Sequence, residues 1–351
     1  MSVLKKLIFF LLFLPVAAMG QYRITGKVVD IVTKKPVANA SVFLSNASAG
    51  AKTNDDGTFT INNVRGGQYT LIVSIIGYAT YSQSILVNKD IALPEMDIAQ
   101  QSIVLKEVRI GPDPHWERHY EEFKRDFLGN GDNAKDCTIL NPHVLDFDAV
   151  KDSLTATAQD FLIIENKALG YRIKYMLSAF DHDYMSGKLY FAGAAFFEDL
   201  KGSERQIKKW HERRLKTYLG SDMHFLRSVI ANRVKEEGFK VERLIRKPNP
   251  DYGKGPGAKY IETLVTTPLG RGEYTKLTDQ KDEYALEFKD FLYVIYDNSP
   301  LAGSTINIDA ADAFFDNNGI ILNPESVTME GSWGESRMPE MLPVDYEPAE
   351  K

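Results

Sequence analysis

Over residues 22–110, apolar and polar residues alternate with a period of two, and turn-forming residues interrupt the alternation roughly every 8 to 12 positions. The alternation is clear where Ile24, Gly26 and Val28 are separated by Thr25 and Lys27. Residues 54–57 read Asn-Asp-Asp-Gly, a turn signal whose glycine can adopt a positive φ. This pattern predicts an all-β sandwich.

Six short strings in this segment, at residues 25–30, 36–37, 40–42, 53–59, 67–71 and 76–78, resemble the carboxypeptidase regulatory-like domain. The resemblance implies a seven-stranded transthyretin-like sandwich. Such domains occur at the N-termini of envelope proteins, including the extension ahead of the plug in many TonB-dependent outer-membrane receptors. The resemblance also implies an accessory role, because the domain that gives the family its name follows a metallopeptidase domain along the chain and is itself non-catalytic.

A related set of sandwich domains binds starch through exposed aromatic side chains. Residues 22–110 contain no tryptophan, so a sugar platform here would depend on Tyr22, Tyr78 or Tyr81. Packing or turn roles are the alternative for these tyrosines.

The first twenty residues have the order of a secretory signal peptide. Lys5 and Lys6 precede an apolar run at residues 7–14, and the small residues at 18 and 20 allow cleavage before Gln21. We therefore expect an exported protein, in the periplasm, associated with the outer membrane, or extracellular. The apolar run is too short to span a bilayer and no later stretch is apolar enough, so no transmembrane segment is expected in the mature chain.

Charge and cysteine content exclude several functions. Lys+Arg 42 against Asp+Glu 48 gives a net charge of −6, which argues against nucleic acid as a partner. Cys137 is the single cysteine, so an intrachain disulfide and a multi-cysteine zinc site are both excluded. We expect Cys137 to be buried, with a reactive or intermolecular thiol as the alternative.

Residues 112–324 predict a second domain, of the α+β class. After a Gly-Pro linker at 111–112, Asp113 is the expected N-cap of a helix whose aromatic residues recur at helical spacing. These aromatic residues are Trp116, Tyr120, Phe123 and Phe127. Strand patterns on both sides of a helical pair at 203–219 and 221–238 predict an antiparallel sheet. The predicted fold class is therefore mainly β, an N-terminal sandwich followed by an α+β domain.

Residues 116–230 also resemble, in order, the second half of an uncharacterised group of exported bacterial proteins that carry the same N-terminal sandwich. The matching positions are Trp116, 126–129, Cys137, 141–142, 169–171, 218–221 and 224–226. This group implies an architecture and no mechanism. Residues 325–351 are acidic and contain prolines, and we expect a loosely held tail there.

Basic residues are concentrated in one segment. Residues 201–247 contain 14 Lys and Arg against 6 Asp and Glu. Arg205, Lys209, Arg213 and Lys216 fall on the face of the first paired helix opposite Ile207 and Trp210. This face is either a solvated surface or a docking patch for an anionic partner: lipopolysaccharide, an acidic glycan or an acidic envelope protein.

Metal and catalytic chemistry has weaker support. His119 and Glu122 form H-x-x-E, with His224 as a distant third ligand of a zinc carboxypeptidase. The motif falls on a predicted amphipathic helix, however, and here the accessory domain precedes the motif, whereas in the carboxypeptidases it follows the catalytic domain. Asp181, His182 and Asp183 could hold a cation, but they fall in a predicted hairpin turn.

The sequence therefore predicts a non-catalytic, exported cell-envelope protein that acts as a binding or interaction module. No catalytic residue, metal site or cofactor is assigned. Two alternatives remain open: a carbohydrate-binding envelope protein and a metal-dependent hydrolase related to zinc carboxypeptidases.

Overall fold

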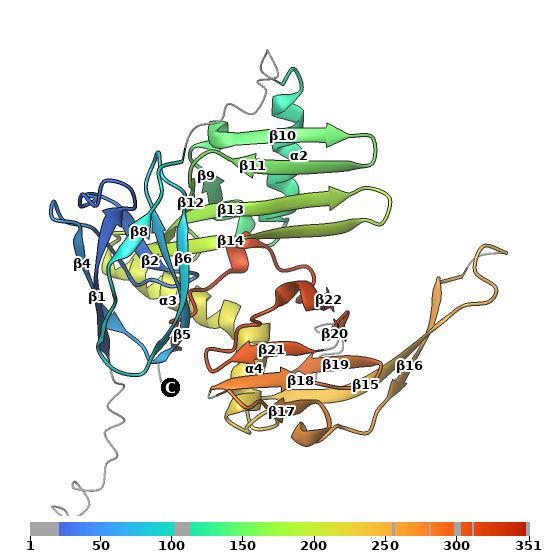
Figure 1. The fold of residues 1–351 in the computed structure, drawn as a ribbon. Helices are drawn as coiled ribbons and strands as arrows, with labels where there is room; N and C mark the ends of the chain where they lie inside the picture. The colour runs from blue at the N-terminus through green and yellow to red at the C-terminus, as the bar shows by residue number, and fades with distance from the viewer. Residues whose placement is uncertain are drawn as a thin grey trace, which may run out of the picture.

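Figure 1 shows the computed structural model of the chain, which describes residues 21–101, 113–254, 257–280, 282–297, 303–310 and 312–348. The predicted signal peptide at 1–20 and the predicted linker at 111–112 lie outside the described residues. Three groups of strands follow one another along the chain: a blue sandwich, a green sheet of long strands, and a pair of orange and red sheets.

The sandwich forms because the alternating side chains of its strands meet between two sheets. Its strands are β1 (Tyr22–Asp30), β2 (Ser41–Leu44), β3 (Gly50–Lys52), β4 (Thr58–Val64), β5 (Gly67–Ser74), β6 (Tyr81–Val87), β7 (Ile91–Ala92) and β8 (Met96–Ile98). One sheet has the order β4-β1-β7, with β8 also paired to β1, and the other has the order β3-β2-β5-β6. Ile24, Leu44 and Leu71 are fully buried between them. The predicted sandwich is confirmed.

Two short strands share one edge of β1. β7 pairs with Ile24 and Thr25, and β8 pairs with residues 28–30, both in parallel. Pro94 lies between β7 and β8 and has no N–H to donate, so the pairing with β1 is interrupted there. The described part of the sandwich therefore has eight strands, where the resemblance implied seven.

The green sheet packs against α2 (Trp116–Leu128). Its strands are β9 (Cys137–Ile139), β10 (Leu145–Val150), β11 (Ser153–Ala158), β12 (Leu162–Asn166), β13 (Tyr171–Asp183) and β14 (Lys188–Asp199). They are ordered β10-β11-β13-β12-β9, and β14 also pairs with β13. Phe123 and Phe127 are fully buried in this core, as their helical spacing predicts.

The predicted N-cap of α2 is wrong. The helix begins at Trp116 with His115 at the cap position. The Asp113 carboxylate instead accepts the backbone N–H of His115 and lies 2.7 Å from the His119 ring, so it stabilises the turn before the helix.

The helical pair consists of α3 (Glu204–Tyr218) and α4 (Asp222–Ile230), and it leads into the orange and red sheets. Their strands are β15 (Phe239–Pro248), β16 (Tyr260–Val265), β17 (Thr275–Leu277), β18 (Glu283–Leu286), β19 (Phe291–Tyr296), β20 (Ser304–Ile308), β21 (Ala313–Asp316) and β22 (Val327–Gly331). Five strands are ordered β16-β15-β19-β20-β22, and three are ordered β17-β18-β21. Phe225 of α4 is fully buried in their core. Short 3-10 turns lie at Ala134–Asp136, Pro142–Val144, Arg271–Glu273, Pro324–Ser326 and Met338–Glu340.

The expected loose tail is instead an integral part of the fold from residue 325 to residue 348. β22 completes the five-stranded sheet, and four later side chains are buried, divided among the three cores. Trp333 joins the core of the orange and red sheets, Met338 and Leu342 join that of the green sheet, and Val344 joins the sandwich. The prediction was wrong because it weighed charge and proline content, whereas these scattered apolar residues decide where the segment lies.

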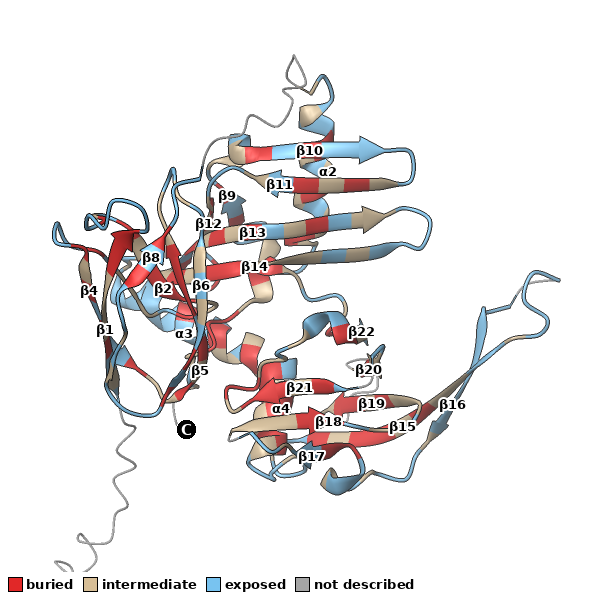
Figure 2. Cartoon of the chain, in the orientation of Figure 1, coloured by how far each residue is buried: buried red, intermediate tan, exposed pale blue. Residues whose placement is uncertain are grey.

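The sandwich and the green sheet are joined by backbone and apolar contacts. The Asn46 N–H donates to the Ala195 carbonyl at 2.7 Å, and the Asn46 side chain accepts the Ala195 N–H at 3.0 Å. Phe43, Ile72 and Ala194 form a small buried cluster beside this junction. In Figure 2, buried residues alternate with less buried ones along the strands of the sheets, whereas β16 is exposed along nearly its whole length.

Two sequence predictions, about membrane-spanning segments and about the thiol, can be compared with these elements. None of the described helices has the length and apolarity needed to cross a membrane. Cys137 is buried in the core beneath α2, and burial raises the pKa of its thiol to about 12, so the side chain behaves as an apolar core residue.

Candidate functional site

The helix that carries the predicted basic face is held firmly on the green sheet. Ser203 and Gln206 form the expected capping box, with the Ser203 N–H donating to the Gln206 side chain at 2.9 Å. Trp210 packs directly over Gly170, where an added Cβ would lie 2.2 Å from the indole ring. The indole N–H also donates to the Lys167 carbonyl at 2.9 Å. The turn between β12 and β13 therefore fixes the position of α3.

Arg214 strengthens the same attachment. The residue is 7% exposed, and its side chain donates to the Leu169 and Gly170 carbonyls at 2.7 and 3.1 Å. It also pairs with Asp199 at 2.7 Å, and its guanidinium lies 3.7 Å from the centre of the Tyr171 ring. Arg214, one of the basic residues of the 201–247 segment, thus stabilises the fold and does not belong to a binding surface.

The four residues predicted for the basic face lie together on the exposed side of α3. Arg205, Lys209, Arg213 and Lys216 are all exposed. They span 11 helical positions, or about 16 Å. Arg213 pairs with Asp136 at 3.0 Å. The other three have no hydrogen bond or ion pair with any residue that the structure describes, so their charges are available to a partner.

The basic segment as a whole does not form one patch. Arg227 on α4 donates to three backbone carbonyls, and Arg243 pairs with Asp290. Arg246 contacts both Glu262 and Glu330. The excess of positive charge read from the sequence is therefore available mainly on α3.

A cleft of about 910 Å³ opens beside this basic face. Arg213 and Lys216 line it together with Asp132, Asp136 and Glu340. Its apolar lining comes from Phe191, Leu219, Met223, Ile320, Trp333, Met338, Met341, Leu342 and Val344. Four of these, Phe191, Leu219, Ile320 and Met341, are only half-buried, so the cleft presents apolar surface to solvent.

Most negative charge in the cleft is already compensated. Asp132 pairs with Lys135 at 2.9 Å and Asp136 pairs with Arg213. Burial raises the pKa of Glu340, which disfavours its charged form. Lys216 thus offers a positive charge beside an apolar lining. A second cavity of about 740 Å³, lined mainly by polar and charged residues that include Lys209 and Arg213, lies on the other side of Arg213.

The zinc ligands suggested by H-x-x-E are not brought together. His119 is buried beside Asp113, and His224 lies 3.4 Å from Glu237 in a different core. Burial lowers the pKa of His224, which suits a neutral core histidine. These two histidines therefore have structural contacts, and the ligand set proposed from their spacing is wrong.

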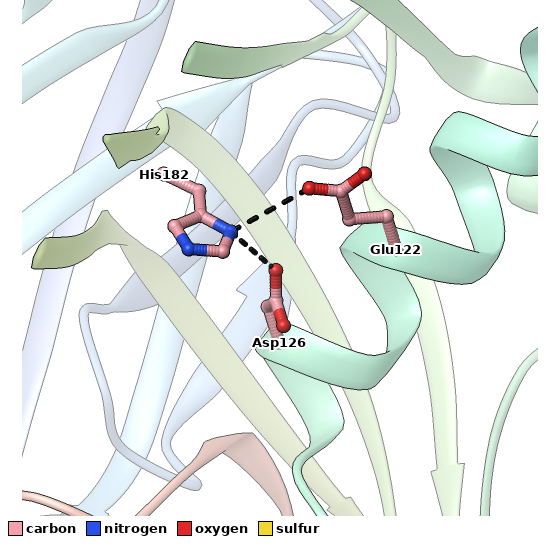
Figure 3. A group of neighbouring side chains, drawn as sticks. All are labelled: Glu122, Asp126 and His182. Carbon is pink, nitrogen blue, oxygen red and sulfur yellow. Dashed lines mark hydrogen bonds and ion pairs between the residues drawn. The ribbon is translucent and has the colours of Figure 1, made fainter. Parts of the chain in front are cut away.

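Glu122 belongs to another cluster, which the sequence did not reveal. It lies beside Asp126 on α2, and both carboxylates face His182 on β13 (Figure 3). The four-residue spacing of the two carboxylates on one helix face was visible in the sequence. The partner was not, because His182 is 56 residues away from Asp126 along the chain.

The hairpin expected at residues 181–183 begins later than predicted. All three residues belong to β13, and the turn follows at 184–187. Asp183 starts this turn, because its carboxylate accepts the Met185 and Ser186 N–H groups. His182 projects to the opposite side from its two neighbours, as strand geometry requires.

The tyrosines considered for sugar binding are half-buried in the sandwich. The Tyr78 hydroxyl donates to Asp30 at 3.1 Å and that of Tyr81 donates to Gln83 at 3.0 Å. Both hydroxyls therefore have partners within the sandwich.

The two-sheet arrangement and its turns agree with a known domain family. Residues 24–110 match the family model of the CarboxypepD_reg-like domain. The match confirms the resemblance inferred from residues 25–78. The CarboxypepD_reg-like domain comprises about a quarter of the chain, and the surfaces on α2 and α3 lie outside it.

Comparison with curated proteins finds no match. Among solved structures, the chain is similar to a type II cohesin–X-dockerin complex from Acetivibrio cellulolyticus, with 22% identity over 22% of this chain, 58% of that chain and a TM-score of 0.21. It is similar to 5-hydroxyisourate hydrolase from Klebsiella pneumoniae, with 19% identity over 23% of this chain, 92% of that chain and a TM-score of 0.20. It is also similar to a DUF3823 family protein from Bacteroides uniformis, with 9% identity over 89% of this chain, 96% of that chain and a TM-score of 0.18.

Proposed function

We propose that this chain is an exported, non-catalytic binding protein of a bacterial cell envelope, and that it docks an acidic segment of a partner protein beside α3. One observation supports this proposal above the others. Arg213 and Lys216 belong both to the exposed basic face and to the lining of the 910 Å³ cleft. Positive charge and accessible apolar surface therefore meet at one place.

The two parts of this surface have different physical roles. The exposed cations on α3 attract and orient an acidic partner over a distance of about 10 Å at moderate ionic strength. The apolar lining supplies affinity when a partner side chain displaces water from it. Met223, Met338 and Met341 line the cleft, and methionine side chains adapt their shape to what binds.

A protein segment suits the cleft better than an anionic glycan does. Sugar rings are usually held on exposed aromatic platforms. Trp333, one of the aromatic residues at the cleft, is 9% exposed and donates its indole N–H to the Gly220 carbonyl. Half-buried Phe191, Leu219 and Met341 instead form a lining suited to an aliphatic side chain.

In this proposal the chain divides into an accessory sandwich at residues 22–110 and a binding domain at residues 112–324. The segment from residue 325 completes the binding domain and adds lining residues to the cleft. Export by the N-terminal signal peptide delivers the protein to the periplasm, to the outer membrane or to the extracellular side.

Site-specific photo-cross-linking in the native envelope tests the proposal. The photoreactive residue p-benzoylphenylalanine replaces Lys209 or Lys216, and in the matched controls it replaces Lys208 or Lys235, which are exposed and lie off the basic face. We expect adducts with one protein from positions 209 and 216 only, and the cross-linked peptide should be rich in Asp and Glu. Equal adducts from all four positions, adducts with glycan alone, or no adduct would each overturn the proposal.

A charge-reversal pair then measures the electrostatic contribution. With the cross-linked peptide as probe, Lys209→Glu combined with Lys216→Glu should weaken binding about tenfold and reduce its salt dependence, because two surface charges change sign. Lys208→Glu combined with Lys235→Glu changes the net charge equally and should leave the affinity unchanged. Equal losses in the two double variants would show that net charge, and not this surface, controls binding.

A further inference from the structure

Glu122, Asp126 and His182 form a cluster that is separate from the basic face and from the cleft. The two carboxylates lie one turn apart on α2, so they project from the same side of the helix. His182 reaches them from β13, and Figure 3 shows one ring nitrogen directed at both carboxylates. Three potential ligand atoms from two elements thus converge on one point.

The spacing of these atoms is close to that in the coordination shell of a small divalent ion. His182 Nδ1 lies 2.8 Å from Asp126 Oδ2 and 3.6 Å from Glu122 Oε1, and all three ligand atoms lie within 4.8 Å of one another. Nitrogen and oxygen ligands bind zinc at about 2.0 to 2.2 Å, which places neighbouring ligands of a tetrahedron about 3.3 to 3.6 Å apart. An ion would fit once His182 Nδ1 and Asp126 Oδ2 move apart by about 0.5 to 0.8 Å, from hydrogen-bonding distance to the spacing of neighbouring ligands.

Neighbouring groups hold the carboxylates in these orientations. Arg125 donates to both oxygens of Asp126, from Nε to Oδ1 at 2.9 Å and from Nη2 to Oδ2 at 3.2 Å, and the Tyr184 ring packs edge-on against the His182 ring with 5.1 Å between the ring centres. Such outer contacts are typical of metal ligands, because they fix the direction of the ligand lone pairs. The side chains of Glu122 and His182 are each 20% exposed, and that of Asp126 is 11% exposed. One side of the cluster therefore stays open for water or a further ligand.

Charge favours a cation at the same point. Arg125 contacts both carboxylates, at 2.9 Å for Asp126 and 3.9 Å for Glu122, and compensates one of the two negative charges. With a neutral His182, one negative charge remains. A mixed set of imidazole nitrogen and carboxylate oxygen suits zinc among the common biological divalent ions, because imidazole disfavours Mg²⁺ and Ca²⁺.

We propose that Glu122, Asp126 and His182 bind one divalent transition-metal ion, with Zn²⁺ as the best-fitting ion, and that this ion links α2 to β13. The alternative is a cluster without metal, in which a protonated His182 forms ion pairs with the two carboxylates. The two arrangements differ in a direct way: only the first takes up an ion, and only the first needs the nitrogen ligand of His182 for that uptake.

Isothermal titration of the full mature chain with ZnCl₂ tests the proposal, with thermal unfolding as a second readout. We expect uptake of one equivalent with an increase in the unfolding temperature. His182→Ala and Asp126→Asn should each weaken uptake at least tenfold. His211→Ala and Glu121→Gln are the matched controls, since they remove an exposed histidine and an exposed carboxylate outside the cluster and should leave uptake unchanged.

A spectroscopic measurement on the unaltered chain avoids dependence on the folding of variants. Co²⁺ bound at this site should give the intense visible absorption of a four-coordinate ion, and ZnCl₂ should displace it. No uptake of either ion by the unaltered chain would overturn the proposal. Uptake that His182→Ala leaves unchanged would also overturn it, because the ion would then be bound elsewhere.

Discussion

Gly170 supports the helix that carries the proposed binding surface, and replacing it by alanine should destabilise that attachment strongly. Gly170 has a φ of 73°, and an alanine there costs about 1 to 2 kcal/mol in backbone strain alone. The new Cβ would also lie 2.2 Å from the Trp210 ring, well inside the distance at which carbon atoms repel. Forcing Trp210 aside adds about 1 to 3 kcal/mol, as overpacking generally does. We therefore expect Gly170→Ala to lower the free energy of unfolding by about 2 to 5 kcal/mol.

Gly187 provides a matched control for the backbone contribution. Its φ is 69°, close to that of Gly170, but an added Cβ would meet no atom within 4 Å. Gly187→Ala should therefore cost only the strain of about 1 to 2 kcal/mol. Urea unfolding followed by tryptophan fluorescence measures both variants. Equal losses in the two variants would refute the reasoning, because the contact with Trp210 would then contribute nothing.

Two further predictions test the C-terminal segment and the acid stability of the sandwich. Arg227 donates to the Asn318, Val344 and Tyr346 carbonyls at 2.8 Å, so Arg227→Ala should lower the free energy of unfolding by about 2 to 3 kcal/mol and speed proteolysis after residue 337. The control Arg233→Ala removes an exposed ion pair with Glu237 and should change the free energy of unfolding by less than about 0.5 kcal/mol. Equal effects of the two variants in urea unfolding would contradict the role given to Arg227. The Thr33 backbone N–H, with further hydrogen bonds from Thr33, Tyr78 and Gln100, lowers the pKa of Asp30 from 3.8 to about 2, so its contribution to stability is present above about pH 4 and is lost as the pH falls toward 2. Asp30→Asn should therefore flatten the loss of stability between pH 4 and pH 2 in acid titrations, whereas the control Asp55→Asn should leave that loss unchanged. An acid profile of Asp30→Asn as steep as that of the unaltered chain would count against this role for Asp30.

The sequence predicted the elements whose side chains follow a regular period. The two-residue alternation around Ile24 and Val28 and the aromatic stripe at Phe123 and Phe127 both point to the cores in which these residues are buried. The capping box at Ser203 was also readable, because all of its atoms come from four consecutive residues. Local geometry alone determines such features.

The candidate sites were only partly readable from the sequence. The exposed basic face of α3 follows from helical spacing, and the structure places all four residues together. The spacing did not reveal that Arg213 pairs with Asp136 or that Arg214 is buried against Tyr171. These contacts depend on how α3 docks on the turn between β12 and β13, and that docking is set by the shapes of Gly170 and Trp210.

The sequence by itself therefore determined the class of fold, the sandwich and its family, and the face of α3 that is charged. Tertiary structure alone decided three further features: the burial of the C-terminal segment in three cores, the cleft beside Lys216, and the meeting of Asp126 with His182. The physical reason is the same in each case. Periodicity reports the direction of a side chain relative to its own backbone, whereas contacts between distant segments depend on how whole elements pack, and no local pattern encodes that packing.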